Sequence, residues 1–452
     1  MARAAAAPKA IKLSKSEKSA VVKQGVPSSV AGQLRRLDTV PQVSVGKSVK
    51  GSNVAAIARK AGVPTPRIAG SGGSTQSRDI PIVPGGNLAA SDSYGSLGSY
   101  GVGTATAICG DQVLAFGHPY SFAPSTKAIH GASAVAVQAA GAFSFKLANL
   151  GAPSGSLLKD GLDGILGKLG AVPNYPKVTS TTNGRQSIST VPNPDALSFT
   201  AAMQAYRDST LVLDQDAGGT SVVTWKINYT RANNAQQSFS RTERYSSSDS
   251  IGTEITMGVA GDIETILGNQ FEDVKITGVT ISNAVSSKYQ AYKIKSVDWR
   301  MGGKWVPKPK SGSKVKARAG RNILIRVHMV NADRKSNLPP KTSIVKWRVP
   351  KSARGASLLS VTGNSSNSDE FEDYETYSDG TFECNDDGEC YMLDDDSAPK
   401  TFDQLIKQMK LLPRQDEFNA SFTLASGRSY DRTRRVPATV TGSFNLKLNI
   451  RK

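Results

Sequence analysis

The chain has no long apolar run and no clear export signal. None of its 452 residues belongs to a stretch of about 18 apolar residues, so the sequence predicts no transmembrane helix. The segment from Met1 to Pro8 holds one arginine and four consecutive alanines, an apolar block too short for a signal-peptide core. Either the protein is cytoplasmic or its natural start lies upstream of Met1; we carry the second expectation forward.

Cysteine is scarce, with three residues in the chain. Cys384 and Cys390 flank Asn-Asp-Asp-Gly-Glu, a predicted tight turn, and this spacing suits a small disulfide loop in an oxidising compartment. Metal binding is the alternative, although two thiols do not complete a zinc site. Cys109 lies in an apolar, strand-like run, so we expect a buried, inert thiol. We expect no cofactor and no metal site.

Acidic residues are few outside one segment. The formal net charge is +19, yet residues 369–396 hold 13 acidic residues and no Lys or Arg, so the remainder carries +32. Such a surface suits nucleic acid, an anionic cell-wall polymer or an acidic partner; a soluble protein with lysine-rich loops is the alternative. No zinc-finger, RNP-like or helix-turn-helix pattern occurs, so we do not expect nucleic acid as a partner.

Glycine is abundant, and runs of Val, Thr and Ser alternate with it, which predicts a mainly β fold with a few helices. In the first half we expect strands over residues 80–90, 101–116 and 143–147, with a hairpin turn at Gly110-Asp111. Further strands are predicted at residues 211–213, 221–229, 274–281, 289–299 and 322–330, followed by final strands at 418–424 and 439–450. Helices are predicted over residues 255–267 and 402–411.

These patterns divide the chain into four predicted regions. Residues 1–75 are a basic linker or remnant with short helices, and residues 76–205 form a compact β domain. Residues 206–350 form a β-sandwich-like domain, and residues 351–452 form a C-terminal β segment with the acidic insert 369–396. Carboxylates around glycine in that insert can bind calcium, but their spacing differs from an EF-hand, and a solvated surface loop is the alternative.

The chain contains three histidines. The alternating pattern around His328 predicts a half-exposed strand residue, and His130 precedes a glycine in a loop-like position without an assigned role. His118 follows the apolar run 112–116 and stands between a glycine and a proline. Glycine allows a sharp backbone turn and proline fixes the exit, so His118 is placed at a strand end. It is either a catalytic group on a rigid scaffold or a structural histidine in a turn.

Five sequence blocks around His118 resemble the SpoIVB-type serine peptidases, relatives of the stage IV sporulation protein B peptidase of bacteria. Residues 103–106 read Gly-Thr-Ala-Thr, and residues 110–120 read Gly-Asp-Gln-Val-Leu-Ala-Phe-Gly-His-Pro-Tyr. Residues 82–89 resemble the family's Pro-Gly segment, and residues 144–148 and 164–170 its later blocks. The resemblance implies a peptidase-like β-barrel over residues 76–205, with His118 as the general base toward a serine hydroxyl.

The nucleophile that the resemblance implies is not found. This family carries its serine in a Ser-Gly-Ser-Pro motif, and no such string occurs in the chain. Residues 154–156 read Ser-Gly-Ser, but leucine follows, and we interpret this as coincidence. Asp160 stands where relatives have Asp-Arg, but Gly161 replaces the arginine. A chain lacking an upstream part explains both the missing serine and the missing signal peptide; a noncatalytic homologue explains only the first.

Two functions of different classes follow. The first is a secreted or envelope SpoIVB-type serine endopeptidase acting on a protein or peptide, represented here by its histidine-bearing part or by a noncatalytic homologue. The alternative is a noncatalytic binding or structural protein of the bacterial cell envelope. An anion-binding protein, with an anionic envelope polymer as partner, ranks third. A serine within hydrogen-bond reach of His118 would distinguish the first two.

Overall fold

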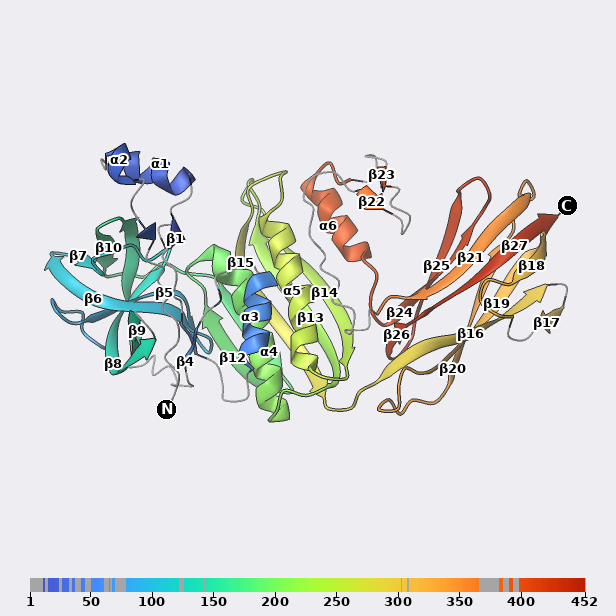
Figure 1. The fold of residues 1–452 in the computed structure, drawn as a ribbon, viewed down its shortest axis with the longest axis horizontal. Coiled ribbons are helices and arrows are strands. Elements are labelled where there is room, and N and C mark those ends of the chain that lie inside the picture. Colours follow the sequence, from blue (N-terminus) through green and yellow to red (C-terminus); the bar gives the residue numbers. More distant parts are fainter. Residues whose placement is uncertain are drawn as a thin grey trace.

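The computed structural model describes most of the chain, in ranges separated by gaps. These ranges are residues 11–12, 15–23, 27–31, 35–36, 42–44, 50–60, 65, 67–69, 79–121, 126–140, 143–301, 303–306, 309–365, 382–384, 390–392 and 398–451. Three bodies follow one another along the long axis: a barrel-like ring of strands, a central sheet covered by helices, and a two-sheet sandwich at the C-terminal end (Figure 1). The prediction of a mainly β fold with a few helices is confirmed.

Six strands make the barrel. They are β5 (Asn87–Gly95), β6 (Ser99–Cys109), β7 (Gln112–Ala115), β8 (Ala128–Ala140), β9 (Phe143–Gly161) and β10 (Gly164–Leu169). Their pairing runs β5-β8-β9-β10-β7-β6 and returns to β5, which closes the ring. The closure is uneven, because register shifts interrupt the β8–β9 ladder in three places. Leu88, Val113, Ile129 and Ile165 fill the interior.

The local predictions hold in part in this body. The strand predicted at residues 80–90 is right only from Asn87, where β5 begins, and His130, expected in a loop-like position, is buried within β8. The expected hairpin is present, since β6 ends and β7 begins on either side of Gly110-Asp111. The predicted strand at residues 143–147 is the start of β9. Cys109 differs from expectation: it is exposed, because it ends β6 at the hairpin, beyond the part of the strand that faces the core.

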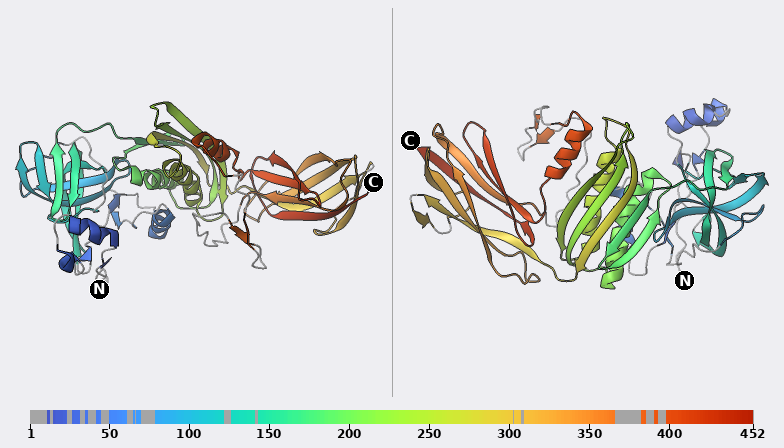
Figure 2. Two further views of the ribbon diagram at one scale, coloured as in Figure 1. Left: turned by 90° about the horizontal axis from the view of Figure 1, so that it is seen from above. Right: turned by 180° about the vertical axis from the view of Figure 1, so that it is seen from behind.

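The central sheet has the order β14-β13-β15-β11-β12, and β12 continues into β5 of the barrel. Its strands are β11 (Lys177–Thr182), β12 (Arg185–Thr190), β13 (Gly219–Thr230), β14 (Gln236–Ser247) and β15 (Lys275–Ser286). Helices α4 (Leu197–Leu213), which follows the short turn η1 (Pro194–Ala196), and α5 (Ile251–Leu267) cover one face (Figures 1 and 2). Every second residue of β13, among them Trp225 and Ile227, is buried in the core shared with α5.

Helix prediction in this body is partly right. The helix expected at residues 255–267 is α5, and it begins earlier, where the Ser250 hydroxyl accepts a hydrogen bond from the Thr253 amide. The strand expected at residues 211–213 is wrong, because these residues form the last turn of α4. Short apolar runs fit a strand or a buried helix end equally well, and α4 is buried along most of its length.

Helix α6 (Phe402–Leu411) lies where a helix was predicted, and it belongs to the central body although it lies far along the chain. The Arg231 guanidinium donates to Glu272 from Nε at 2.7 Å and to Asp403 from Nη1 at 2.8 Å. Arg241 donates to the carbonyls of Met409 and Pro413. It is the cross-strand partner of Trp225, on the face of the sheet that α5 covers. These contacts fix α6 beside the edge strand β14.

The sandwich is built from two sheets. One contains β16 (Ala291–Met301), β17 (Lys304–Val306), β19 (Asn322–Asn331), β20 (Lys341–Arg348) and β26 (Thr439–Thr441). The other contains β18 (Lys314–Arg318), β27 (Ser443–Arg451), β21 (Gly355–Gly363), β24 (Glu417–Thr423) and β25 (Ser429–Arg435). Their inner faces share one apolar core that includes Trp299, Trp347 and Phe422.

The sheets group the sequence differently from the predicted regions. Within the predicted region 206–350, the strands up to Ser286 join the central sheet and those from Ala291 onward join the sandwich, so this region contributes to both bodies. The C-terminal strands complete the sandwich rather than forming a separate segment. Sequence order misleads here because α6 interrupts the sandwich strands and packs on another body.

Several short elements precede the barrel. They are β1 (Ile11–Lys12), α1 (Lys15–Lys23), α2 (Ser28–Ala31), β2 (Arg35–Arg36), β3 (Gln42–Ser44), α3 (Gly51–Lys60) and β4 (Arg67–Ala69). Among them, β3 pairs with β6, and α3 packs on α4 and α5 through Val54, Ile57 and Ala58. In the described residues, no helix combines the length and the apolar character needed to cross a membrane.

Most of the acidic insert lies outside the described residues, so its calcium and surface-loop alternatives stay predictions. Within it, β22 (Phe382–Cys384) pairs with β23 (Cys390–Met392), and the backbone places Cys384 directly opposite Cys390. Directly opposed residues of an antiparallel pair have Cα atoms about 4.5–5.5 Å apart, which a disulfide can span. The two side chains lie outside the described part, so the disulfide itself stays a prediction.

Candidate functional site

Strand β7 carries His118 to the rim of the barrel. The strand is held on both sides, by β6 and β10, and ends at Ala115. Phe116 and Gly117 follow with φ values of 77° and 71°, and two successive left-handed residues turn the chain sharply away from the sheet. His118 thus lies just beyond a strand end, as predicted, and its side chain is half-buried.

The turn before His118 depends on a glycine of the resembling blocks. A Cβ on Gly103 would lie 2.2 Å from the Phe116 ring, so only glycine leaves room for that ring against β6. The Phe116 amide in turn donates to the Thr104 carbonyl at 3.0 Å. The blocks at residues 103–106 and 110–120 therefore meet in space, and their shared pattern has a packing explanation.

The His118 imidazole is anchored by its own loop. Its Nδ1 lies 2.7 Å from the Pro119 carbonyl oxygen, which can only accept, so Nδ1 carries the proton in this contact. In the neutral ring Nε2 then carries the lone pair that a general base needs. Among the described residues, no hydrogen bond joins this Nε2 to a serine hydroxyl. The ring also lies 5.8 Å from the Phe116 ring, centroid to centroid.

Asp160 fixes the loop that follows His118. Its Oδ1 accepts from the Tyr120 amide and its Oδ2 from the Ser121 amide, both at 2.7 Å. A carboxylate that accepts two backbone amides holds a loop in one conformation. Relatives have Asp-Arg at this position; here Gly161 replaces the arginine, and Asp160 accepts from the two loop amides and from the Ser121 hydroxyl.

A buried ion pair lies beneath the same loop. Lys127 Nζ is 2.7 Å from Asp92 Oδ1, and the side chain of Lys127 is only 1% exposed. The Tyr120 hydroxyl donates to the other oxygen of Asp92 at 3.0 Å, and Asn193 also donates to this carboxylate. Burial, and next the charge of Asp92, hold the pKa of Tyr120 well above its usual value. Sequence reasoning missed this pair, because residues 30 or more apart gave no local signal.

A second histidine of the barrel forms a serine–histidine pair. His130 Nε2 lies 2.8 Å from Ser91 Oγ, and His130 Nδ1 lies 3.0 Å from the Gly151 carbonyl oxygen. Burial lowers the pKa of His130 to about 4. Ser91 is 0% exposed and His130 is 1% exposed, so no peptide reaches this hydroxyl. The pair ties β5, β8 and β9 together instead.

The remaining candidates lie apart from His118. Residues 154–156, the Ser-Gly-Ser string, are an extended part of β9 rather than a turn, consistent with coincidence. His328 is half-buried on β19, as predicted, and its Nε2 lies 2.8 Å from Asp298 Oδ2. Arg326 donates to that same oxygen from Nη2 at 2.6 Å. This cluster belongs to the sandwich, at the opposite end of the molecule from the barrel (Figure 1).

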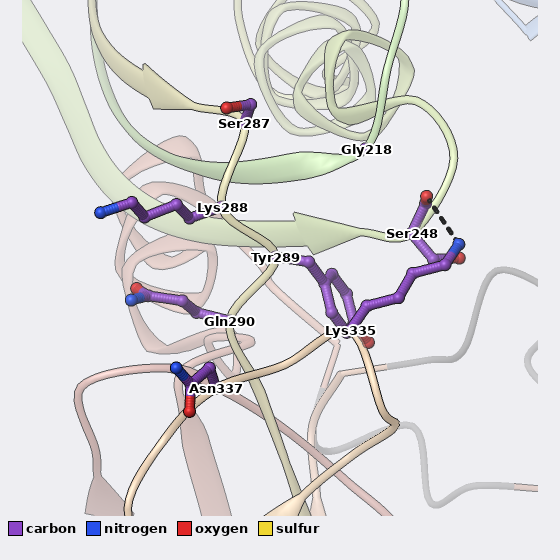
Figure 3. A pocket seen from close by; sticks show the side chains of 8 residues that line it. All are labelled: Gly218, Ser248, Ser287, Lys288, Tyr289, Gln290, Lys335 and Asn337. Atoms are coloured by element: carbon purple, nitrogen blue, oxygen red, sulfur yellow. Dashed lines mark hydrogen bonds between the residues drawn. The ribbon is translucent and has the colours of Figure 1, made fainter.

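A polar cavity lies between the central body and the sandwich. Its volume is about 500 Å³, and it is lined by Gly218, Ser248, Ser287, Lys288, Tyr289, Gln290, Lys335 and Asn337. Figure 3 shows Lys335 reaching across it, where Nζ lies 3.5 Å from the Ser248 carbonyl oxygen. The cavity contains none of the predicted site residues. In the described ranges, no group of three or more His, Cys, Asp and Glu side chains is placed to hold a metal ion.

Comparison of the chain with family models, with curated proteins and with solved structures found no match. The likeness to SpoIVB-type peptidases therefore rests on the sequence blocks around His118 alone.

Proposed function

We propose that the barrel is the histidine-bearing part of a SpoIVB-type serine peptidase site, with His118 as the general base, in a protein of the bacterial cell envelope. The observation that carries this proposal is the bond from His118 Nδ1 to the Pro119 carbonyl oxygen at 2.7 Å. In the neutral ring this bond assigns the proton to Nδ1 and the lone pair to Nε2, and the ring is half-buried at the barrel rim. The Asp160 bonds to the following loop and the buried Asp92–Lys127 pair support the same placement.

In the proposed reaction, Nε2 of His118 takes the proton of a serine hydroxyl while the serine oxygen bonds to the scissile carbonyl carbon of a peptide. The same proton then passes to the leaving amine as the C–N bond breaks. A carbonyl such as that of Pro119 orients the imidazole, but it stabilises the imidazolium less than a carboxylate would. The chain has no Ser-Gly-Ser-Pro motif, so the proposal takes the serine from a separate segment that carries one.

The test is labelling by a serine-reactive fluorophosphonate. We expect the 452-residue chain alone to remain unlabelled, because what survives without a nucleophile is binding and oxyanion stabilisation. Adding a Ser-Gly-Ser-Pro-bearing segment from a SpoIVB-type relative should produce labelling of that segment, and His118→Ala should abolish it. A His328→Ala variant is the matched control and should label normally. Labelling that survives His118→Ala would contradict the proposal.

One observation favours the alternative, a noncatalytic homologue that binds or supports envelope components. Phe116, Gly103 and Asp160 all have structural explanations, so the blocks around His118 would persist in a fold that had lost its chemistry. Under this alternative, the complemented chain stays unlabelled although the added segment binds it. A binding measurement run beside the labelling separates the two functions.

A further inference from the structure

The positive charge of the chain is concentrated in the sandwich. Residues 291–365 and 414–452 contain 26 Lys and Arg against five Asp and Glu, a formal charge of +21. This exceeds the +19 of the whole chain, so the other regions together are slightly acidic. The sandwich therefore carries the largest block of positive charge in the chain, while the acidic insert 369–396 accounts for the negative balance elsewhere.

Within the sandwich, two neighbouring strands gather cations on one outer face. Strand β18 alternates so that Val315 and Ala317 face the core, and β27 does the same with Leu448 and Ile450. The residues between them point outward and are exposed: Lys314, Lys316, Arg318, Lys447, Asn449 and Arg451. We call these six residues the cationic strip. It lies at the C-terminal end of the molecule, far from the barrel (Figure 1).

The strip places like charges directly beside each other. In the parallel register of β18 and β27, Lys314 is the partner of Lys447, and Arg318 is the partner of Arg451. Like charges directly opposite across two strands destabilise a sheet. No Lys or Arg of the strip lies within 4.0 Å of a carboxylate oxygen in the described part of the chain. The fold thus retains two unfavourable pairs without local compensation.

Protection of a sheet edge explains only half of this arrangement. Strand β18 is an edge strand, where lysines discourage pairing with another chain. Strand β27 is not an edge, because it lies between β18 and β21. Lys447 and Arg451 therefore need another explanation, and an external anion that neutralises both strands supplies one.

We propose that the cationic strip binds a linear polyol-phosphate polymer. Outward cations are two residues apart on β18, about 6.6 Å, and four residues apart on β27, about 13 Å, so the two strands present rows of cations that suit an extended polyanion better than a single small anion. The arginine forks suit phosphate oxygens, and Asn449 with the neighbouring exposed Asn445 offers amides to polyol hydroxyls. The strip has no aromatic side chain on which a nucleic-acid base could stack, which disfavours single-stranded nucleic acid.

The experiment measures binding of the full chain to a glycerol-phosphate oligomer at several salt concentrations. If all five cations contact phosphates, log K should fall with log salt with a slope of about −3.5, at roughly 0.7 per contact for a flexible polyanion. Lys447→Gln with Arg451→Gln should weaken binding at least tenfold and reduce the slope by about 1 to 2. The control is Lys346→Gln with Arg348→Gln, the same charge change on exposed positions of β20, and it should stay within about twofold of the unmodified chain.

Thermal unfolding of each variant establishes that it is folded before binding is compared. Equal losses in the two variants would overturn the proposal in favour of diffuse charge attraction. Absence of binding at low salt would also overturn it. A single-stranded DNA with the same number of phosphates is the second probe; if it binds more tightly through the strip, the polymer class is wrong. None of these outcomes depends on the peptidase proposal, which concerns His118.

Discussion

Ser91 donates its hydroxyl proton to Nε2 of His130 across 2.8 Å, while Nδ1 of the same ring donates to the Gly151 carbonyl oxygen. These are the roles of the neutral imidazole; in a charged ring Nε2 would instead donate to the hydroxyl oxygen, so the hydrogen bonds alone do not exclude the charge. Burial, which disfavours the charged ring, lowers the pKa of His130 to about 4. The pair therefore acts as a stability element that depends on pH.

The first prediction concerns that dependence. In the unfolded chain a histidine has a pKa of about 6.5, so below this value the unfolded state binds more protons than the folded state. The contribution of His130 to stability is therefore complete above about pH 6.5 and is lost progressively down to about pH 4, by up to about 3 kcal/mol. Urea unfolding at pH 7 and pH 4.5 measures the loss.

Another buried group opposes this effect in the same window. Burial raises the pKa of Asp262 to about 6, so its ionisation disfavours the folded state as the pH rises toward neutrality. The comparison of the unmodified chain with His130→Gln isolates the histidine, since both contain Asp262. An unchanged pH dependence in His130→Gln would show that the assignment is wrong, and His118→Ala should retain the dependence.

The second prediction concerns the ion pair under the His118 loop. Asp92→Asn removes the carboxylate from Lys127, which stays almost fully buried, and should cost about 3–5 kcal/mol of unfolding free energy. Asp111→Asn is the matched control, because its partner Lys168 lies 3.6 Å away and both side chains are 58% exposed. That change should cost less than about 1 kcal/mol. Chemical denaturation measures both losses of unfolding free energy. Similar losses in the two variants would contradict the larger cost assigned to the buried pair.

The third prediction tests the packing that aims His118. Gly103→Ala places a methyl group 2.2 Å from the Phe116 ring and should destabilise the barrel by about 1–3 kcal/mol. Phe116→Ala removes the ring, so adding Gly103→Ala to it should cost much less than Gly103→Ala costs alone. A double-mutant cycle measures this coupling. Additive effects would mean that the two residues do not hold each other in place.

The fourth prediction follows from the like charges on β18 and β27. Lys447→Glu converts the repulsive pair with Lys314 into an attractive one and should raise stability by about 0.2–1 kcal/mol. The control is Lys346→Glu on the other sheet of the sandwich. In the described register, the cross-strand partner of Lys346 is Leu324, which is uncharged. This control substitution should change stability by less than about 0.5 kcal/mol. A destabilised Lys447→Glu would contradict the cost assigned to the pair.

The sequence predicted those elements that are set by neighbouring residues in the chain. The hairpin at Gly110-Asp111, the helices α5 and α6 and the strand-end position of His118 follow from turn residues, capping and periodicity. The same signals failed at residues 211–213, where a buried helix end resembles a short strand. They also failed at Cys109, because an apolar strand does not reveal which of its residues lie beyond the core.

The contacts that define the candidate site were not predictable in the same way. Asp92 and Lys127 are joined by strand pairing around the ring, and Ser91 meets His130 across β5 and β8. Such partners are set by the register between strands that are distant in sequence, here the β5–β8 ladder, and the local sequence signals did not reveal it. The membership of α6 in the central body has the same cause, since its partners Arg231 and Arg241 lie more than 160 residues earlier.

The position of α6 also decides how the molecule responds to tension. The chain leaves the sandwich after β21, forms α6 against the central sheet, and returns as β24, next to β21. A pull on the C-terminal strands is therefore shared between the connection at residues 287–290 and the segment anchored by Arg231 and Arg241. The sandwich is therefore connected to the central body at more than one point. To separate the two bodies, a pulling force must first detach α6 from the central sheet.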